Sequence, residues 1–240
     1  MMGVRMPSPP GPASEVFAMR LLASMLLCLA AVGSYATDKA VDEKKVVSAI
    51  EKTGAKVTVV ESEPTGPKLK VSFAKWDASK ALSLKGSPYV TFLVVEDAAR
   101  VTDQTMALFA SLPNLERLDL FKPSLTGAGL KPFKAHKTLK SLTLFEARVG
   151  DAAVADLKDV DTLEELDLSK TLITNQSAFT FQKLENLKML TVAMTKFNGK
   201  GALLLKDMPK LKQLHALNCD ISVDEAKELE KAIKGIKIER

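Results

Sequence analysis

Apolar residues recur along most of this chain at a spacing of about 24 residues. In each copy they alternate with polar residues over a short stretch, which is the pattern of a half-buried β-strand. One such strand with its helical return cannot bury its apolar face alone, so the units are predicted to stack into a solenoid. The central apolar residues of the predicted strands are Leu69, Leu93, Leu118, Leu142, Leu166, Leu190, Leu214 and Ile236.

Five consecutive units share the frame LxxLxLxxNxL. They are LERLDLFKPSL from Leu115, LKSLTLFEARV from Leu139, LEELDLSKTLI from Leu163, LKMLTVAMTKF from Leu187 and LKQLHALNCDI from Leu211. This frame resembles the leucine-rich repeat, whose units of about 20 to 29 residues follow L-x-x-L-x-L-x-x-N/C-x-L. The resemblance implies an α/β fold: a curved horseshoe segment with a parallel sheet on the concave face and helices on the convex face.

The chain departs from this family mainly at the asparagine-or-cysteine position of the frame. In the family, that side chain hydrogen-bonds the backbone of the turn that leaves the strand. Pro123 and Ala147 cannot do so, and two units are therefore expected to lack the contact. The five residues at this position are Pro123, Ala147, Thr171, Thr195 and Cys219.

The segments that follow the strands resemble the cysteine-containing, F-box-associated style of repeat. Examples are LTGAGL from Leu125 and VGDAAV from Val149. Repeats of this style also occur in exported bacterial proteins, and the chain looks more like one of those. Ubiquitin-ligase function is not implied, because no F-box-like segment accompanies the repeats.

Both ends of the array are predicted to be caps, because the outermost apolar layers must be shielded from water. Residues 37–64 contain an amphipathic run that is apolar at Val47 and Ile50, followed by an alternating strand at Val57 and Val59. We assign this segment to an N-terminal capping helix and strand. Residues 65–240 are assigned to the repeat domain, which closes on a capping strand around Ile236.

Residues 1–36 have the features of a secretory signal peptide. Met19 and Arg20 precede a mostly apolar stretch, and small residues end at Ala36. The stretch is shorter than the roughly 20 residues that span a bilayer, so an uncleaved anchor is the weaker alternative. The sequence upstream of Met19 is unusual for such a signal, and Met19 is an alternative start. The mature chain is therefore predicted to be exported, to a periplasmic, cell-surface or secreted location, without a transmembrane segment.

Composition limits the chemistry of the mature chain. Its one cysteine, Cys219, cannot form an intramolecular disulfide and is predicted to be a buried structural thiol. Neither CxxC nor HExxH occurs, so no metal or cofactor is expected. The net charge of +5 comes with lysines interspersed with acidic residues, and aromatic residues make up only 5%. This pattern favours a solvated surface over a nucleic-acid platform. The local excess at Lys131, Lys134, Lys137 and Lys140 is interpreted as a hydrated edge, with contact to an anionic surface as the alternative.

Candidate binding residues lie between the framework leucines, where side chains point to the concave face of the predicted sheet. They fall into three columns across the strands. The first runs Phe92, Arg117, Ser141, Glu165, Met189, Gln213; the second Val94, Asp119, Thr143, Asp167, Thr191, His215; the third Glu96, Phe121, Phe145, Ser169, Ala193, Leu217. From these we select Arg117, Asp119, Phe121, Phe145, Glu165, Asp167 and His215 as the binding residues.

Phe121 and Phe145 are predicted to be neighbours on adjacent strands, about 4.8 Å apart along the sheet. Exposed neighbouring aromatic residues are typical anchors for a partner protein. The alternative is that both rings pack under the loops that leave the strands.

Catalysis on this surface is disfavoured by the spacing of its polar residues. Asp167 and His215 share a column but lie two strands apart, roughly 10 Å, too far for the direct contact that a nucleophilic triad needs. Glu165 and Asp167 lie on one open strand face, where little desolvation would separate their pKa values. The sequence therefore predicts a non-enzymatic, exported module that binds a protein or peptide through its concave face. The alternative is a glycan-binding or structural protein of the cell envelope.

Overall fold

The computed structural model describes residues 44–45, 47–63, 66–80 and 84–240 of the chain. The predicted signal peptide, residues 1–36, lies outside the described residues, as does the beginning of the predicted N-terminal cap. Residues 46–240 form one compact unit. Within the described part of the chain, no helix has both the length and the apolar character needed to cross a membrane.

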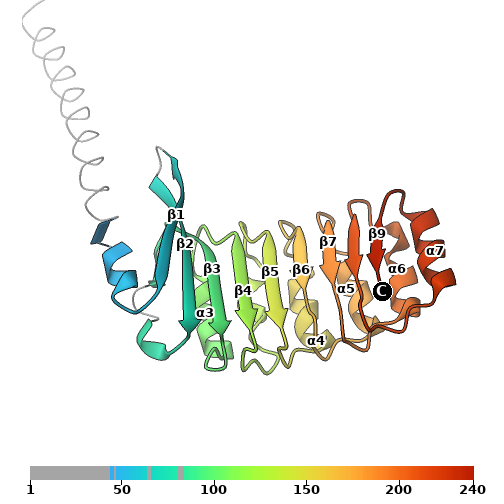
Figure 1. Ribbon diagram of the computed structural model, residues 1–240, viewed down its shortest axis with the longest axis horizontal. Coiled ribbons are helices and arrows are strands. Elements are labelled where there is room, and N and C mark those ends of the chain that lie inside the picture. The colour runs from blue at the N-terminus through green and yellow to red at the C-terminus, as the bar shows by residue number, and fades with distance from the viewer. Residues whose placement is uncertain (1–43, 46, 64–65, 81–83) are drawn as a thin grey trace, which may run out of the picture. The chain divides into compact units, whose positions relative to one another are not determined.

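The described residues form one sheet whose strands follow each other in chain order (Figure 1). The first pair is antiparallel, and every later pair is parallel. A register shift between Val59 and Glu61 leaves Val60 as an extra residue in the first strand. The strands are β1 (Lys56–Glu63), β2 (Gly66–Lys75), β3 (Val90–Asp97), β4 (Arg117–Phe121), β5 (Ser141–Phe145), β6 (Glu165–Asp167), β7 (Met189–Thr191), β8 (Gln213–His215) and β9 (Lys237–Glu239).

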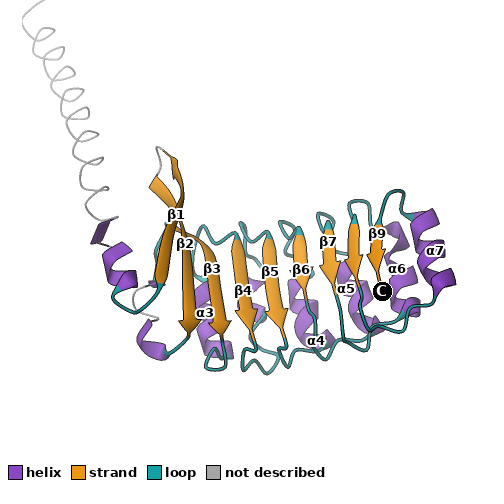
Figure 2. Ribbon diagram, viewed as in Figure 1, coloured by secondary structure: helices purple, strands orange, loops and turns teal. Residues whose placement is uncertain are grey.

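Short helices return the chain from one strand to the next and lie together on one side of the sheet (Figure 2). Most are single turns of α- or 3-10 helix, because a 24-residue unit leaves little chain after its strand and turns. The helices are η1 (Ala78–Lys80), α3 (Asp103–Ala110), η2 (Lys131–Phe133), α4 (Asp151–Val154), η3 (Ala155–Leu157), η4 (Asn175–Ser177), α5 (Ala178–Phe181), α6 (Gly199–Leu204), η5 (Leu205–Asp207) and α7 (Val223–Ala232). The ten-residue α7 begins with a reciprocal cap between Ser222 and Glu225.

The framework leucines form the core between the sheet and the helices. Leu118, Leu142 and Leu166 are direct partners on consecutive parallel strands, and each is at most 1% exposed. An aromatic cluster fills the N-terminal end, where the Trp76 ring contacts Phe73 and Phe109 edge-on at centroid distances of 5.3 and 5.0 Å. The predicted α/β solenoid, with a parallel sheet on one side and helices on the other, is confirmed.

The turn after each strand repeats as regularly as the core. One residue in the turn, one to three positions beyond the end of the strand, has a left-handed backbone with φ between 55° and 59°: Lys122, Glu146, Lys170, Met194 and Asn218. At the next position, the hydroxyls of Thr171 and Thr195 donate to the carbonyls of Leu168 and Val192 at 2.6 and 2.7 Å. Threonine thus replaces the asparagine of the family frame.

Cys219 occupies the same position in the last full frame. Its thiol is half-buried and donates to the Val192 carbonyl of the preceding unit at 3.2 Å. Pro123 and Ala147, which carry no donor, make no such contact, as the sequence predicted.

A second row of polar contacts joins neighbouring units where the helices begin. Asp151 accepts hydrogen bonds from the backbone N–H of Thr174 at 2.8 Å, from the Thr174 hydroxyl at 2.7 Å and from the Ser177 hydroxyl at 2.5 Å. One unit further on, Asn175 accepts from the N–H of Asn198 at 3.0 Å and donates to its side chain at 2.8 Å. These contacts connect consecutive units independently of the leucine core.

Candidate functional site

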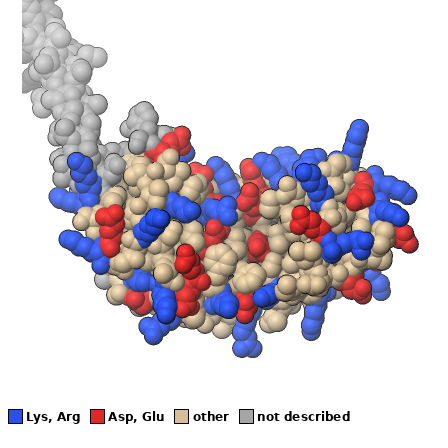
Figure 3. Space-filling model, in the orientation of Figure 1, with Lys and Arg blue, Asp and Glu red and all other residues tan. Residues whose placement is uncertain are grey.

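The face of the sheet opposite the helices carries the residue columns predicted from the sequence. We call this face, the concave face of the predicted horseshoe, the sheet face. The strand registers place Phe92, Arg117, Ser141, Glu165, Met189 and Gln213 in one row across β3 to β8, as predicted, and extend it to Lys70 on β2 and Lys237 on β9. Lysines and acidic residues are interspersed over this side of the molecule rather than separated by sign (Figure 3).

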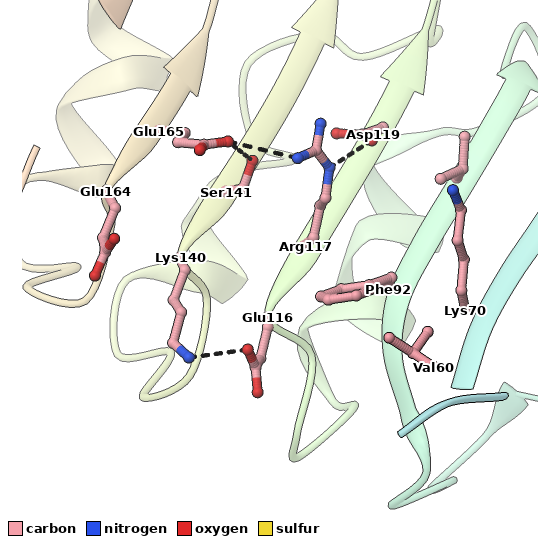
Figure 4. Close-up of a pocket in the computed structure, with 11 residues that line it drawn as sticks. Val60, Lys70, Phe92, Glu116, Arg117, Asp119, Lys140, Ser141, Glu164 and Glu165 are labelled. Carbon is pink, nitrogen blue, oxygen red and sulfur yellow. Dashed lines mark hydrogen bonds and ion pairs between the residues drawn. The ribbon is translucent and has the colours of Figure 1, made fainter. Parts of the chain in front are cut away.

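Arg117 joins two of the predicted carboxylates. Its Nε lies 2.8 Å from Oδ2 of Asp119 on the same strand, and its Nη1 lies 3.5 Å from Oε2 of Glu165 two strands away. Ser141, on the strand between them, donates its hydroxyl to the same Glu165 oxygen at 3.0 Å (Figure 4). The hydrogen bond to Asp119, opposed by partial burial, raises the pKa of Arg117, so the guanidinium is charged.

Asp119 is the most buried member of this group, with 7% of its surface exposed. Its Oδ2 is paired with Arg117, whereas its Oδ1 is buried without a hydrogen-bond partner in the structure. A buried acceptor without a donor costs about 1 to 3 kcal/mol. The unpaired oxygen of Asp119 therefore makes the folded protein less stable than it would be with a hydrogen-bond donor at that atom.

A hollow of about 510 Å³ lies over this group on the sheet face. Volumes of about 300 to 1,000 Å³ are typical of ligand sites. Its lining comes from β1 to β6 and from the residues that precede β4, β5 and β6: Val60, Lys70, Phe92, Val94, Glu116, Arg117, Asp119, Lys140, Ser141, Glu164 and Glu165. A smaller hollow of about 120 Å³ shares Arg117, Ser141 and Glu165 and continues to Met189 and Thr191 on β7.

Phe121 and Phe145 end β4 and β5 side by side. Their ring centroids are 6.1 Å apart with planes inclined by 49°. Phe121 is 36% exposed and Phe145 is half-buried, and the ammonium of Lys170 lies 4.9 Å from the centroid of the Phe145 ring. Since Phe121 is exposed, the pair forms an apolar surface at the edge of the sheet face instead of being fully covered by loops.

The remaining predicted residues, Asp167 and His215, make separate local contacts. Asp167 accepts from the backbone N–H and the hydroxyl of Ser169 at 2.8 and 2.6 Å. His215 Nδ1 lies 2.7 Å from Oε2 of Glu239 on the neighbouring strand. The structure thus brings Arg117, Asp119 and Glu165 together and leaves these two outside the network. No group of three or more His, Cys, Asp and Glu residues in the described segments is placed to hold a metal ion.

Of the residues that line the hollow, only Arg117, Asp119 and Glu165 were selected from the sequence; the apolar and cationic residues at its N-terminal side, Val60, Lys70 and Phe92, were not. Phe92 stands in the same predicted row as Arg117 but was not selected, and extending that row by one strand toward the N-terminus would have found Lys70. Val60 had no such signal, because it reaches the hollow through the extra residue in β1, and a bulge shifts the alternation on which the columns depend.

Among the known proteins compared with this chain, only solved structures match it. No protein-family profile and no curated protein matches the sequence. An internalin from Listeria monocytogenes aligns with a TM-score of 0.45 and 14% identity over 68% of this chain, and the chain spans 56% of that structure. The ectodomain of the Arabidopsis thaliana receptor kinase SOBIR1, described as a leucine-rich-repeat structure, aligns with a TM-score of 0.38 and 17% identity over 75% of this chain and 94% of its own.

The fold is a solenoid whose strands follow one another in chain order and whose units carry the leucine-rich-repeat frame found in the sequence.

Proposed function

We propose that this protein is a non-enzymatic, exported leucine-rich-repeat module that binds a protein or peptide through its sheet face. The observation that carries the proposal is the hollow of about 510 Å³ on the same face as the Phe121–Phe145 pair. A hollow with apolar and charged lining on the same face as a partly exposed aromatic pair is a typical arrangement for partner recognition.

The contacts of the polar residues support binding over catalysis. Arg117 is shared between Asp119 and Glu165, Asp167 is held by Ser169, and His215 faces Glu239. Catalytic acids and bases need separated pKa values and a water-excluded site. The carboxylates of the hollow instead have structural partners on an open sheet.

Export is proposed from the sequence features of residues 1–36, with a periplasmic, cell-surface or secreted location in a bacterium. The array without disulfides is compatible with that location, because stacked leucine layers and the rows of hydrogen bonds between units hold the mature chain together. Export is tested separately by fusing the full chain to a reporter enzyme that lacks a signal peptide of its own and is active only outside the cytoplasm.

A glycan is the second candidate partner, and the aromatic pair favours it specifically. Sugar rings stack on exposed aromatic faces, and hydroxyls hydrogen-bond to carboxylate and guanidinium groups such as those of Glu165 and Arg117. In this case the site would be the same, but soluble oligosaccharides would compete for it.

We expect that replacing both Phe121 and Phe145 with alanine will weaken partner binding about 100-fold, because aromatic anchors carry a large part of the binding free energy of an interface. Affinity capture from a native cell envelope with the tagged full chain, followed by mass spectrometry, measures this. Phe179→Ala is the matched control, because Phe179 lies on α5 on the helical side and is 54% exposed.

The capture experiment decides between the candidates. A protein retained by the wild type and by Phe179→Ala, but lost by the double variant, supports protein binding on the sheet face. If oligosaccharides release the captured material, the glycan alternative is correct. If the double variant, still folded by circular dichroism, retains the same material as the wild type, the sheet-face proposal is wrong.

A further inference from the structure

The charged residues around the hollow differ in whether they already have partners. Lys140 pairs with Glu116 at 2.9 Å, and Glu164 pairs with Lys188 at 2.6 Å. Asp119 and Glu165 are both bound to Arg117. Every carboxylate in the lining therefore has a cationic neighbour in the structure.

Lys70 is the exception among the charged lining residues. Its side chain is exposed, and no ion pair joins it to any residue in the described part of the chain. On the sheet it lies between Thr58 of β1 and Phe92 of β3, neither of which is charged. An unpaired ammonium beside a hollow attracts an anionic group, and binding one breaks no existing ion pair.

The lining next to Lys70 is apolar. Val60 is 47% exposed, and Phe92 and Val94 are half-buried. Figure 4 shows Val60, Phe92 and Lys70 together on one side of the hollow, with Arg117, Asp119 and Glu165 further along the sheet. A ligand that places a carboxylate near Lys70 can therefore bury an apolar group against Val60 and Phe92.

We propose that the hollow recognises an acidic side chain that adjoins a large apolar side chain in an extended segment of the partner protein. This inference rests on the proposed function and specifies the chemistry of the ligand. A basic segment fits less well, because it would have to compete with Arg117, Lys140 and Lys188 for carboxylates that those residues already hold. The smaller hollow toward Met189 and Thr191 gives such a segment room to continue across the strands.

Two model peptides test the proposal: acetyl-Glu-Phe-amide, and acetyl-Gln-Phe-amide, which is almost identical in shape but neutral. We expect the glutamate peptide to bind the full chain about tenfold more tightly, the ratio expected for one partly shielded ion pair. Titration followed by amide chemical shifts measures both affinities and locates the bound peptide. Raising the salt concentration should reduce the preference, because salt screens exposed charges.

Lys70→Met should abolish the preference for the glutamate peptide. Lys237→Met should keep it, because Lys237 occupies the same row at the far end of the sheet. Phe92→Ala should weaken both peptides equally. Equal affinity of the two peptides for the wild type, an unchanged preference in Lys70→Met, or shifts confined to residues outside the hollow would each overturn the proposal.

Failure of the acidic-segment proposal can be distinguished from failure of the proposed sheet-face binding. A captured partner that is lost by the Phe121 and Phe145 double variant but bound normally by Lys70→Met leaves sheet-face binding intact and removes the acidic-segment proposal. A partner that both variants retain removes both.

Discussion

Replacing Leu142 with alanine is expected to lower the free energy of unfolding by about 3 to 4 kcal/mol. Leu142 is fully buried in the middle of the sheet, where it is the direct partner of Leu118 and Leu166. The truncation removes apolar contacts and leaves a cavity that the neighbouring layers cannot fill, because each is held by its own unit. Chemical denaturation followed by circular dichroism measures the loss.

The position of Leu142 predicts a second effect of the same substitution. In a solenoid each unit contacts its neighbours alone, so a weak layer in the middle uncouples the two halves. The variant should therefore unfold over a broader range of denaturant, or in two steps. Ile238→Ala is the control, because half-buried Ile238 lies on the last strand and its loss should fray one end at a smaller cost. Equal costs at the two positions would argue against stacked layers as the source of stability.

Asp151→Ala is expected to cost about 3 kcal/mol. The Asp151 carboxylate accepts three hydrogen bonds from Thr174 and Ser177 of the next unit. The net contribution of a hydrogen bond to a charged group is about 1.5 to 3 kcal/mol, and bonds that share one carboxylate do not add in full. Alanine also leaves the Thr174 N–H without its partner. Urea denaturation at neutral pH measures the loss. Asp156→Ala in the helical turn that follows is the control, since the Asp156 carboxylate makes no hydrogen bond to any of the described residues.

The same carboxylate predicts a pH dependence. Burial raises the pKa of Asp151, but the hydrogen bonds from Ser177 and Thr174 together outweigh it and hold the pKa below its ordinary value of 3.8. A carboxyl whose pKa is lowered by folding stabilises the protein above its unfolded pKa, and this contribution is lost as the pH falls toward the folded pKa. The difference in stability between wild type and Asp151→Ala should thus be constant from pH 7 to about 5 and shrink below about 4. A difference that stays unchanged down to pH 3 would contradict this account.

The fold could be predicted because its cause is periodic. Each leucine layer repeats the same burial, so the spacing from Leu118 to Leu142 to Leu166 specifies strands, registers and the side on which the helices pack. The row that contains Arg117 and Glu165 followed from the same alternation. The ion pair between Arg117 and Glu165 could not be predicted in this way. It depends on the rotamer of the long Arg117 side chain, whose acceptor lies two strands away.

Two features could not be predicted from periodicity. Val60 reaches the hollow through a bulge, which interrupts the alternation of the strand by one residue. The contact of Asp151 with Thr174 joins polar residues in successive units, and polar positions at the surface leave no apolar pattern that would mark them as partners. Both depend on local geometry that the leucine frame does not encode.

The central claim is that partners bind on the sheet face, and site-specific photo-crosslinking tests it most directly. A photoreactive phenylalanine analogue is placed at Met189, a half-buried residue at the smaller hollow, and separately at Phe179 on the helical side. We expect the captured partner to be crosslinked from position 189 and not from position 179. Crosslinking from position 179 with none from position 189 would place the partner on the helices and contradict the proposed function.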